Sequence, residues 1–289
     1  MECDAGTVTA TLARRQARHT PQPWLRRLGP EPAQPAARLV CFPHAGGGAG
    51  AYRPLAAALA DATRTHRTGP YEMLAVQYPG RQERIHEERV EDLAELAERA
   101  FRAVLPLADR PLTLLGHSMG AVVAYEVARR LEDAGTGPAH LIVSGAWAPD
   151  RVRDRAVRLR DDDGLVEELR STRGTDPRLL RHPDVLAMAL PVLRSDYTAL
   201  ETYRHRPGRP LTAPVTALVG DADPVVDVPE AAAWERHTRG PFRLRVFPGG
   251  DHFYLTAHWP DLAGYVCEQP QPLPGPRVPL SPPVPALAR

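Results

Sequence analysis

Short apolar runs alternate with helical patterns along most of the chain. The apolar runs predict buried strands at residues 38–42, 73–78, 112–115, 140–145, 214–220 and 242–247. Between them, residues 52–59 and 90–104 carry apolar side chains at helical spacing, and a small-residue helical run follows residue 119. Alternating strands and helices imply parallel strands joined by right-handed crossovers. We therefore predict an α/β fold, with a mostly parallel central sheet flanked by helices.

Residues 150–203 interrupt this alternation, because no convincing strand occurs within them. Their apolar positions instead predict short helices at 165–169, 185–193 and 197–203. A helical insert between two strands of such a sheet usually lies over the carboxyl edge of the sheet. We expect residues 150–203 to form a helical lid within a single domain that spans residues 23–268.

The most specific motif is Gly116-His-Ser-Met-Gly, which directly follows an apolar run and opens a helical run. Gly-x-Ser-x-Gly between a strand and a helix is the pattern of a nucleophile elbow. The turn requires glycine at Gly116 and Gly120, where side chains would collide with the adjoining strand and helix. It exposes the hydroxyl of Ser118 and places the backbone N–H of Met119 beside it. We predict Ser118 as a nucleophile, although five residues alone are a weak pattern.

A serine hydroxyl needs a base, and the base needs a carboxylate to orient it. In chain order the two partners of an elbow serine follow it, on loops after late strands. The loop after residue 247 supplies His252, which we predict as general base and acid. The loop after residue 220 offers two carboxylates, Asp221 and Asp223. We favour Asp223 because it lies further into the loop, just before a proline, and Asp221 remains the alternative.

Stabilising an oxyanion requires two N–H donors. Met119 is expected to supply one, and the other should come from the glycine-rich loop after the first predicted buried strand. In that loop, Phe42-Pro-His-Ala-Gly-Gly-Gly, we favour the N–H of Ala45, with Gly46 next. The neighbouring His44 and His117 are more simply explained as structural residues.

Composition excludes several other classes of protein. The net charge is +1 and no basic stripe occurs, so nucleic acid is not an expected partner. The 3 cysteines are too few and odd in number for a disulfide framework, which favours the cytoplasm. No apolar stretch reaches the roughly 18 residues that cross a bilayer, and no secretory signal is evident. Residues 1–22 are expected to be a disordered leader and residues 269–289 a disordered, Pro-rich tail.

No pattern in the chain predicts a metal or a phosphate-binding loop. The pair His86-Glu87 is followed by Val90 where a zinc protease needs histidine. The run from Gly46 to Gly48 lacks the lysine and spacing of a P-loop. We therefore expect neither a metal nor a cofactor.

Taken together, these motifs resemble the type II thioesterases that accompany polyketide synthases and nonribosomal peptide synthetases. The resemblance covers the chain from about Trp24 to Cys267. The motifs that carry it are Trp24-Leu-Arg-Arg, Leu39-Val-Cys-Phe-Pro-His-Ala-Gly-Gly, Gln77-Tyr-Pro-Gly-Arg, Gly116-His-Ser-Met-Gly-Ala, Arg194-Ser-Asp-Tyr, Gly220-Asp-Ala-Asp-Pro and Phe247-Pro-Gly-Gly-Asp-His-Phe-Tyr-Leu. The family's serine, aspartate and histidine fall on Ser118, Asp223 and His252.

The resemblance implies an α/β-hydrolase fold and hydrolysis of acyl thioesters on the phosphopantetheine arm of a carrier protein. Such an enzyme clears stalled or wrongly primed groups from the assembly line. The implied partner is an acyl or peptidyl carrier protein; phosphopantetheine belongs to that substrate, and we expect a monomer. The arginines between residues 151 and 158 either face an acidic carrier protein or, as the simpler explanation, only solvent. Alternatives are a carboxylesterase, an acyltransferase with the same three residues, and a non-catalytic binding module.

Overall fold

A single seven-stranded sheet organises the computed structural model, which describes residues 24–269. The strands are β1 (Leu25–Arg27), β2 (Ala37–Phe42), β3 (Tyr71–Val76), β4 (Leu112–His117), β5 (His140–Ser144), β6 (Val215–Gly220) and β7 (Phe242–Phe247). Their order is β1-β3-β2-β4-β5-β6-β7, and every neighbouring pair except β1–β3 is parallel. The expected leader (1–22) and the expected tail beyond residue 269 lie outside the described residues.

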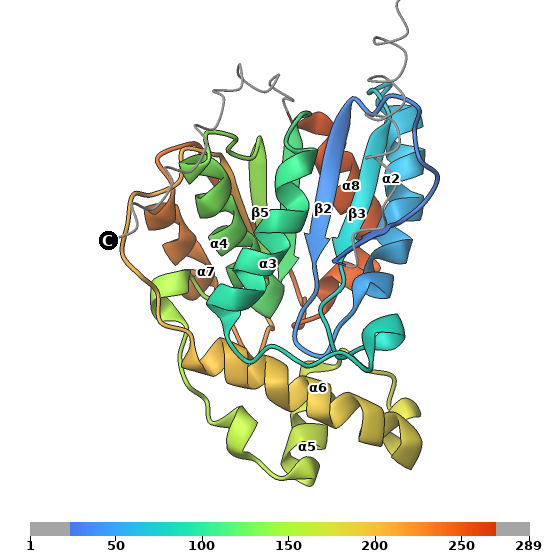
Figure 1. Ribbon diagram of the computed structural model, residues 1–289, viewed down its shortest axis with the longest axis vertical. Helices are drawn as coiled ribbons and strands as arrows, with labels where there is room; N and C mark the ends of the chain where they lie inside the picture. The colour runs from blue at the N-terminus through green and yellow to red at the C-terminus, as the bar shows by residue number, and fades with distance from the viewer. Residues whose placement is uncertain (1–23, 270–289) are drawn as a thin grey trace, which may run out of the picture.

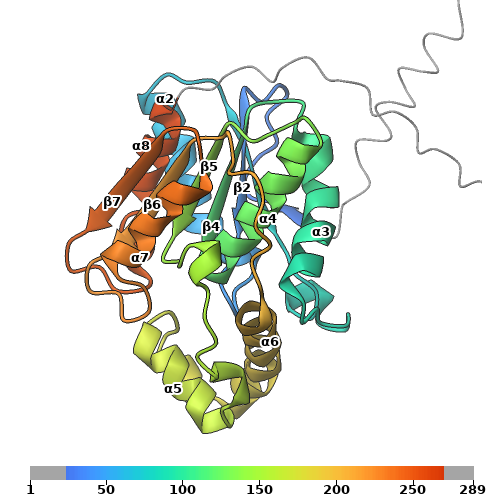
Figure 2. The ribbon, with the colours of Figure 1, turned by 90° about the vertical axis from the view of Figure 1, so that its left-hand side faces the viewer.

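Helices cover both faces of the sheet (Figures 1 and 2). They are α2 (Arg53–Thr65), α3 (Leu93–Val104), α4 (Met119–Asp133), α5 (Asp162–Thr172), α6 (Pro183–Thr202), α7 (Val228–Ala232) and α8 (Trp259–Glu268). Buried side chains of α2 and α8 belong to one apolar cluster, and those of α3 and α4 belong to another. The mostly parallel, two-faced α/β fold predicted above is confirmed.

The sequence did not predict β1. It is only three residues long, and two of them are arginines, so no apolar alternation marks it. It pairs antiparallel with β3 at the edge of the sheet, and Arg27 donates to the buried carboxylate of Glu72. Tertiary pairing, rather than local propensity, therefore defines this strand.

The insert between β5 and β6 carries α5 and α6 and no strand among residues 150–203. The prediction of two separate short helices at 185–193 and 197–203 is wrong, because α6 runs unbroken from Pro183 to Thr202. It contains Pro191, which removes one helical hydrogen bond. Buried Leu190 and Leu193 pack on α5 and compensate for that loss. In Figure 1 α5 and α6 lie beneath the ends to which the strand arrows point.

No helix among residues 24–269 is long and apolar enough to cross a membrane.

Candidate active site

The serine of the elbow lies in a strained backbone conformation between β4 and α4. Ser118 has φ 54° and ψ −124°, a region that non-glycine residues rarely occupy. Its N–H donates to the carbonyl of Ser144 at 2.8 Å, on the adjacent strand β5. Ser118 is the N-cap residue of α4 and makes no side-chain capping hydrogen bond. The N–H of Met119 stands in the first turn of that helix, where it has no intrahelical acceptor.

Both glycines of the elbow stand where a side chain has no room. A Cβ on Gly116 would lie 2.3 Å from the carbonyl oxygen of Gly120 and 2.4 Å from the Cα of Ala121. A Cβ on Gly120 would lie 2.1 Å from the carbonyl oxygen of Phe42. The predicted collision with the helix is confirmed at Gly116, while Gly120 brings the start of α4 against the end of β2 and the loop that follows it.

The histidine and an aspartate meet on the loops after β7 and β6. The Nδ1 of His252 lies 2.9 Å from the Oδ2 of Asp223, and both side chains are buried. The other oxygen of Asp223 accepts from the N–H of Val225 at 2.8 Å, which fixes the carboxylate. This arrangement makes Nδ1 the protonated nitrogen, so Nε2 is left as the basic one. Asp221, the alternative, instead accepts from the N–H of Gly249 at 2.6 Å.

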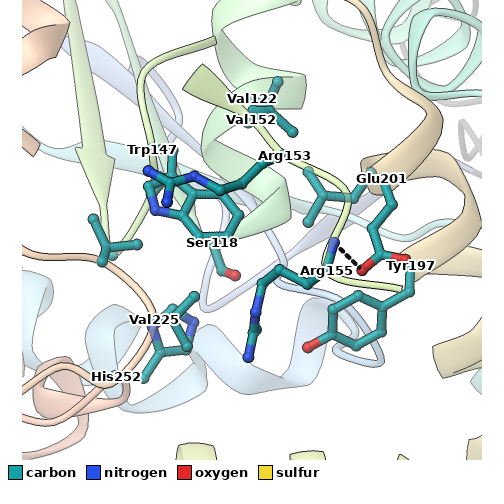
Figure 3. Close-up of a pocket in the computed structure, with 14 residues that line it drawn as sticks. Ser118, Val122, Trp147, Val152, Arg153, Arg155, Tyr197, Glu201, Val225 and His252 are labelled. Atoms are coloured by element: carbon teal, nitrogen blue, oxygen red, sulfur yellow. Dashed lines mark hydrogen bonds between the residues drawn. The ribbon is translucent and has the colours of Figure 1, made fainter. Parts of the chain in front are cut away.

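Ser118 and His252 line the same pocket, shown in Figure 3. Apolar side chains form much of its remaining wall. These are Val122, Ala146, Trp147, Val152, Leu200, Val225 and Val226. Tyr197 and Glu201, both on α6, also line it, so the insert forms one side of the pocket. The arrangement can hold an apolar group beside a serine hydroxyl and an imidazole.

The loop after β2 carries the two expected backbone donors, Ala45 and Gly46. The N–H of Gly46 donates to the Oδ2 of Asp196 at 2.7 Å, so it is already satisfied. Ala45 therefore stays the predicted partner of Met119 for an oxyanion. Sequence reasoning did not single out Asp196 for a role, since the residue lies 150 positions further along the chain.

Two more histidine rings form a row with His252. The ring of His117 lies 5.0 Å from that of His252, and the ring of His44 lies 5.8 Å from that of His117. Burial, reinforced by His252, holds the pKa of His117 well below its usual range. Desolvation, with smaller effects from His252 and Arg81, lowers the pKa of His44 to about 4. Both rings are therefore neutral near pH 7, and their low pKa values make them weak bases.

A buried hydrogen-bond chain supports the elbow from behind. The Nδ1 of His117 lies 3.0 Å from the Oγ of Ser144, which lies 2.6 Å from the hydroxyl of Tyr254. Tyr254 follows His252 by two positions, so the chain links the histidine loop to β4 and β5. Sequence reasoning placed Tyr254 in a motif but assigned it no contact. The hydrogen bond of His117 to Ser144 agrees with the structural role that the sequence favoured for this histidine.

The arginines after β5 are largely paired within the protein. Arg153 pairs with Glu230, and Arg155 pairs with Glu168 at 2.7 Å. Arg158 lies 3.1 Å from Glu201. The last two pairs join parts of the insert, whereas Arg153 joins the insert to α7. Arg153 and Arg155 also line the pocket of Ser118, which weakens the interpretation of these arginines as a surface for an acidic partner. Within residues 24–269 no group of three or more His, Cys, Asp or Glu side chains could hold a metal ion.

The sheet order, the crossovers and the elbow between β4 and α4 define an α/β-hydrolase fold. Comparison with known proteins identifies the family. A family model described as "Thioesterase domain" matches residues 37–269. The chain belongs to this thioesterase family.

Individual relatives agree with this assignment. The chain is 48% identical over 235 residues to a Streptomyces griseus protein named "Probable cadicidin biosynthesis thioesterase", and the match covers 81% of this chain and 62% of that protein. It is 45% identical over 247 residues to thioesterase PikA5 of Streptomyces venezuelae, covering 85% of this chain and 84% of the relative.

Solved structures show the same similarity. The type II thioesterase BorB from the borrelidin biosynthetic cluster superposes with a TM-score of 0.77 at 45% identity, covering 86% of this chain and 97% of BorB. RedJ, a thioesterase from the prodiginine pathway of Streptomyces coelicolor, gives a TM-score of 0.72 at 34% identity, covering 82% of this chain and 96% of RedJ.

Proposed function

We propose that this chain is a type II thioesterase that hydrolyses acyl thioesters on the phosphopantetheine arm of carrier proteins. Its role is to clear unproductive acyl groups from a polyketide or nonribosomal peptide assembly line. One observation carries the proposal: a thioesterase-family chain places Ser118 and the Asp223-paired His252 on one apolar pocket. Relatives named for such pathways, BorB and PikA5 among them, support the substrate class.

The proposed reaction begins when the Oγ of Ser118 attacks the thioester carbonyl and Nε2 of His252 takes the hydroxyl proton. Asp223 stabilises the resulting imidazolium through Nδ1. The N–H groups of Met119 and Ala45 stabilise the tetrahedral oxyanion. The pantetheine thiolate leaves with the proton from His252, and water then attacks the acyl-serine with His252 again as base. No metal or redox cofactor takes part in this scheme.

The insert acts in this proposal as a lid. α6 lines the pocket through Tyr197 and Glu201, so its position sets the space for the acyl group.

Two cysteines among the described residues, Cys41 and Cys267, are buried and unpaired. That state fits the reducing cytoplasm that we propose as the site of action.

The test is hydrolysis of a panel of acyl groups, each loaded on a carrier protein and compared with the equivalent oxygen ester. We expect carrier-bound thioesters to be the better substrates and Ser118→Ala to lose at least ~10³-fold in kcat/KM. Ser171→Ala, the same change on an exposed position of α5, is the matched control and should retain wild-type activity. Wild-type activity in Ser118→Ala would reject the mechanism. Preference for the oxygen ester would instead favour a carboxylesterase.

A further inference from the structure

The loop that carries Ala45 is held in place by a buried ion pair from two distant parts of the chain. Arg81, which follows β3, and Asp196, in the middle of α6, form two hydrogen bonds of 2.7 Å each. The Oδ2 of Asp196 also accepts from the N–H of Gly46, and an Nη1 hydrogen of Arg81 is donated to the carbonyl of Gly47 at 2.9 Å. The pair therefore binds the loop backbone on both sides of the Gly46–Gly47 peptide, at the N–H of Gly46 and the carbonyl of Gly47.

A third buried side chain completes this support. The Oε1 of Gln77 accepts from the N–H of Ala49 at 2.8 Å, and its Nε2 donates to the carbonyl of Arg81 at 3.3 Å. Gly46 has φ +76°, so the loop turns sharply immediately after Ala45. The backbone from Gly46 to Ala49 thus has three polar anchors, and Ala45 is the residue just before them.

The burial of the pair indicates a role beyond stability. The side chains of Arg81 and Asp196 are 7% and 1% exposed. The free energy lost when two charges leave water offsets much of the free energy gained from their attraction. A buried ion pair is therefore weak evidence for a role in stability alone. The pair also fixes the position of the loop, because each partner makes a further hydrogen bond to the loop backbone.

Asp196 belongs to the helix that also lines the acyl pocket. Tyr197 and Glu201 of α6 face the pocket, while Asp196 binds the loop of the expected oxyanion donor. Leu193 lies on the same side, since a Cβ on Gly46 would be 3.1 Å from its Cδ1. A displacement of α6 that opens the pocket would therefore pull on the loop as well.

We infer that Arg81 and Asp196 are positioning residues that hold the N–H of Ala45 in place only while the lid helix α6 is seated. This inference rests on the proposed function and deepens it. Admission of a substrate beneath α6 and completion of the oxyanion site are thereby coupled through one ion pair. Neither residue touches the reacting atoms.

The test uses steady-state kinetics on an acyl-carrier protein and the rate at which a fluorophosphonate labels Ser118. Asp196→Ala removes the contact to Gly46, and we expect kcat and the labelling rate to fall roughly 100-fold, with KM changed less than about threefold. Asp196→Asn keeps an oxygen that accepts from Gly46, so its loss should be nearer to tenfold. If the role of Asp196 were purely structural, folded Asp196→Ala and folded Asp196→Asn would have the same kcat.

Controls separate positioning from stability. Glu72→Gln disrupts another buried carboxylate, which pairs with Arg27 and Arg38 where β3 begins, and it should lower thermal stability without lowering kcat. If the single variants fail to fold, Arg81→Met with Asp196→Leu removes both charges and leaves none unpaired. We expect that double variant to fold and still to lose kcat.

The outcomes are distinct from those of the proposed function. If Ser118→Ala is inactive but folded Asp196→Ala and the double variant keep wild-type kcat and labelling rates, the positioning role is wrong and the proposed reaction stands. A rise in KM with unchanged kcat would also overturn it, because only ground-state binding would then depend on the pair. Full activity in Ser118→Ala would reject the reaction itself.

Discussion

Adding one methyl group to Gly120 tests whether the elbow must touch the end of β2 and the loop that follows it. A Cβ at this position would lie 2.1 Å from the carbonyl oxygen of Phe42 and 2.5 Å from that of Pro43. Ordinary van der Waals contact begins at 3.4 Å. Both obstacles are backbone atoms that no rotamer change can move, so α4 and the loop must separate by about 1 Å.

The separation gives two expected magnitudes for Gly120→Ala. Overpacking of this kind costs about 1–3 kcal/mol, which corresponds to a fall in Tm of roughly 3 to 10 °C for a domain of this size. The same movement carries Ala45 away from Met119, and a misplacement of about 1 Å reduces kcat by ~10²-fold. Because assays run well below Tm, the loss of kcat should persist in fully folded protein.

The assay pairs differential scanning fluorimetry with hydrolysis of an acyl-carrier protein. Gly264→Ala is the matched control, because Gly264 lies in α8 and its added Cβ would come no closer than 3.5 Å to His66. Alanine is the better helix former, so this control should keep or slightly raise Tm and leave kcat unchanged. Wild-type Tm and kcat in Gly120→Ala would refute the close approach on which the elbow geometry depends.

Two further predictions concern titratable side chains. Asp223→Asn should lower kcat by ~10³- to 10⁴-fold because it leaves His252 in the wrong tautomer, whereas Asp221→Asn should stay within about fivefold of wild type; equal losses would contradict the assignment. Burial, with a smaller effect from Arg243, lowers the pKa of His140 to about 4. Below about pH 6.5 this histidine is protonated in the unfolded chain but stays neutral in the folded protein until the pH nears 4. The free energy of unfolding is therefore highest above pH 6.5 and falls by about 2 kcal/mol as the pH drops to 5. Denaturant unfolding of His140→Gln should show a shallower fall, and an identical pH profile would contradict this reasoning.

Much of the fold could be predicted because its signals are local. The apolar runs of β2 to β7 and the glycines around Ser118 each fit within a few residues of sequence. Chain order and loop position led to His252 and to Asp223 over Asp221, and the structure pairs the first two at 2.9 Å. Their catalytic roles remain predictions until activity is measured.

The remaining features depend on contacts between distant residues. The continuity of α6 through Pro191 follows from packing against α5, which no window of sequence reveals. Asp196 lies 115 positions from Arg81, and both belong to motifs whose purpose the sequence did not explain. Only the folded chain shows that these two motifs meet at the loop of Ala45.

The central claim is that a serine hydroxyl activated by His252 attacks the acyl group. The most direct measurement is mass spectrometry of peptides after stoichiometric labelling with a fluorophosphonate, with thioester hydrolysis followed on the same samples. We predict one adduct, on Ser118, and loss of hydrolysis in proportion to its occupancy. An adduct elsewhere, or hydrolysis that continues when Ser118 is fully modified, would contradict the account.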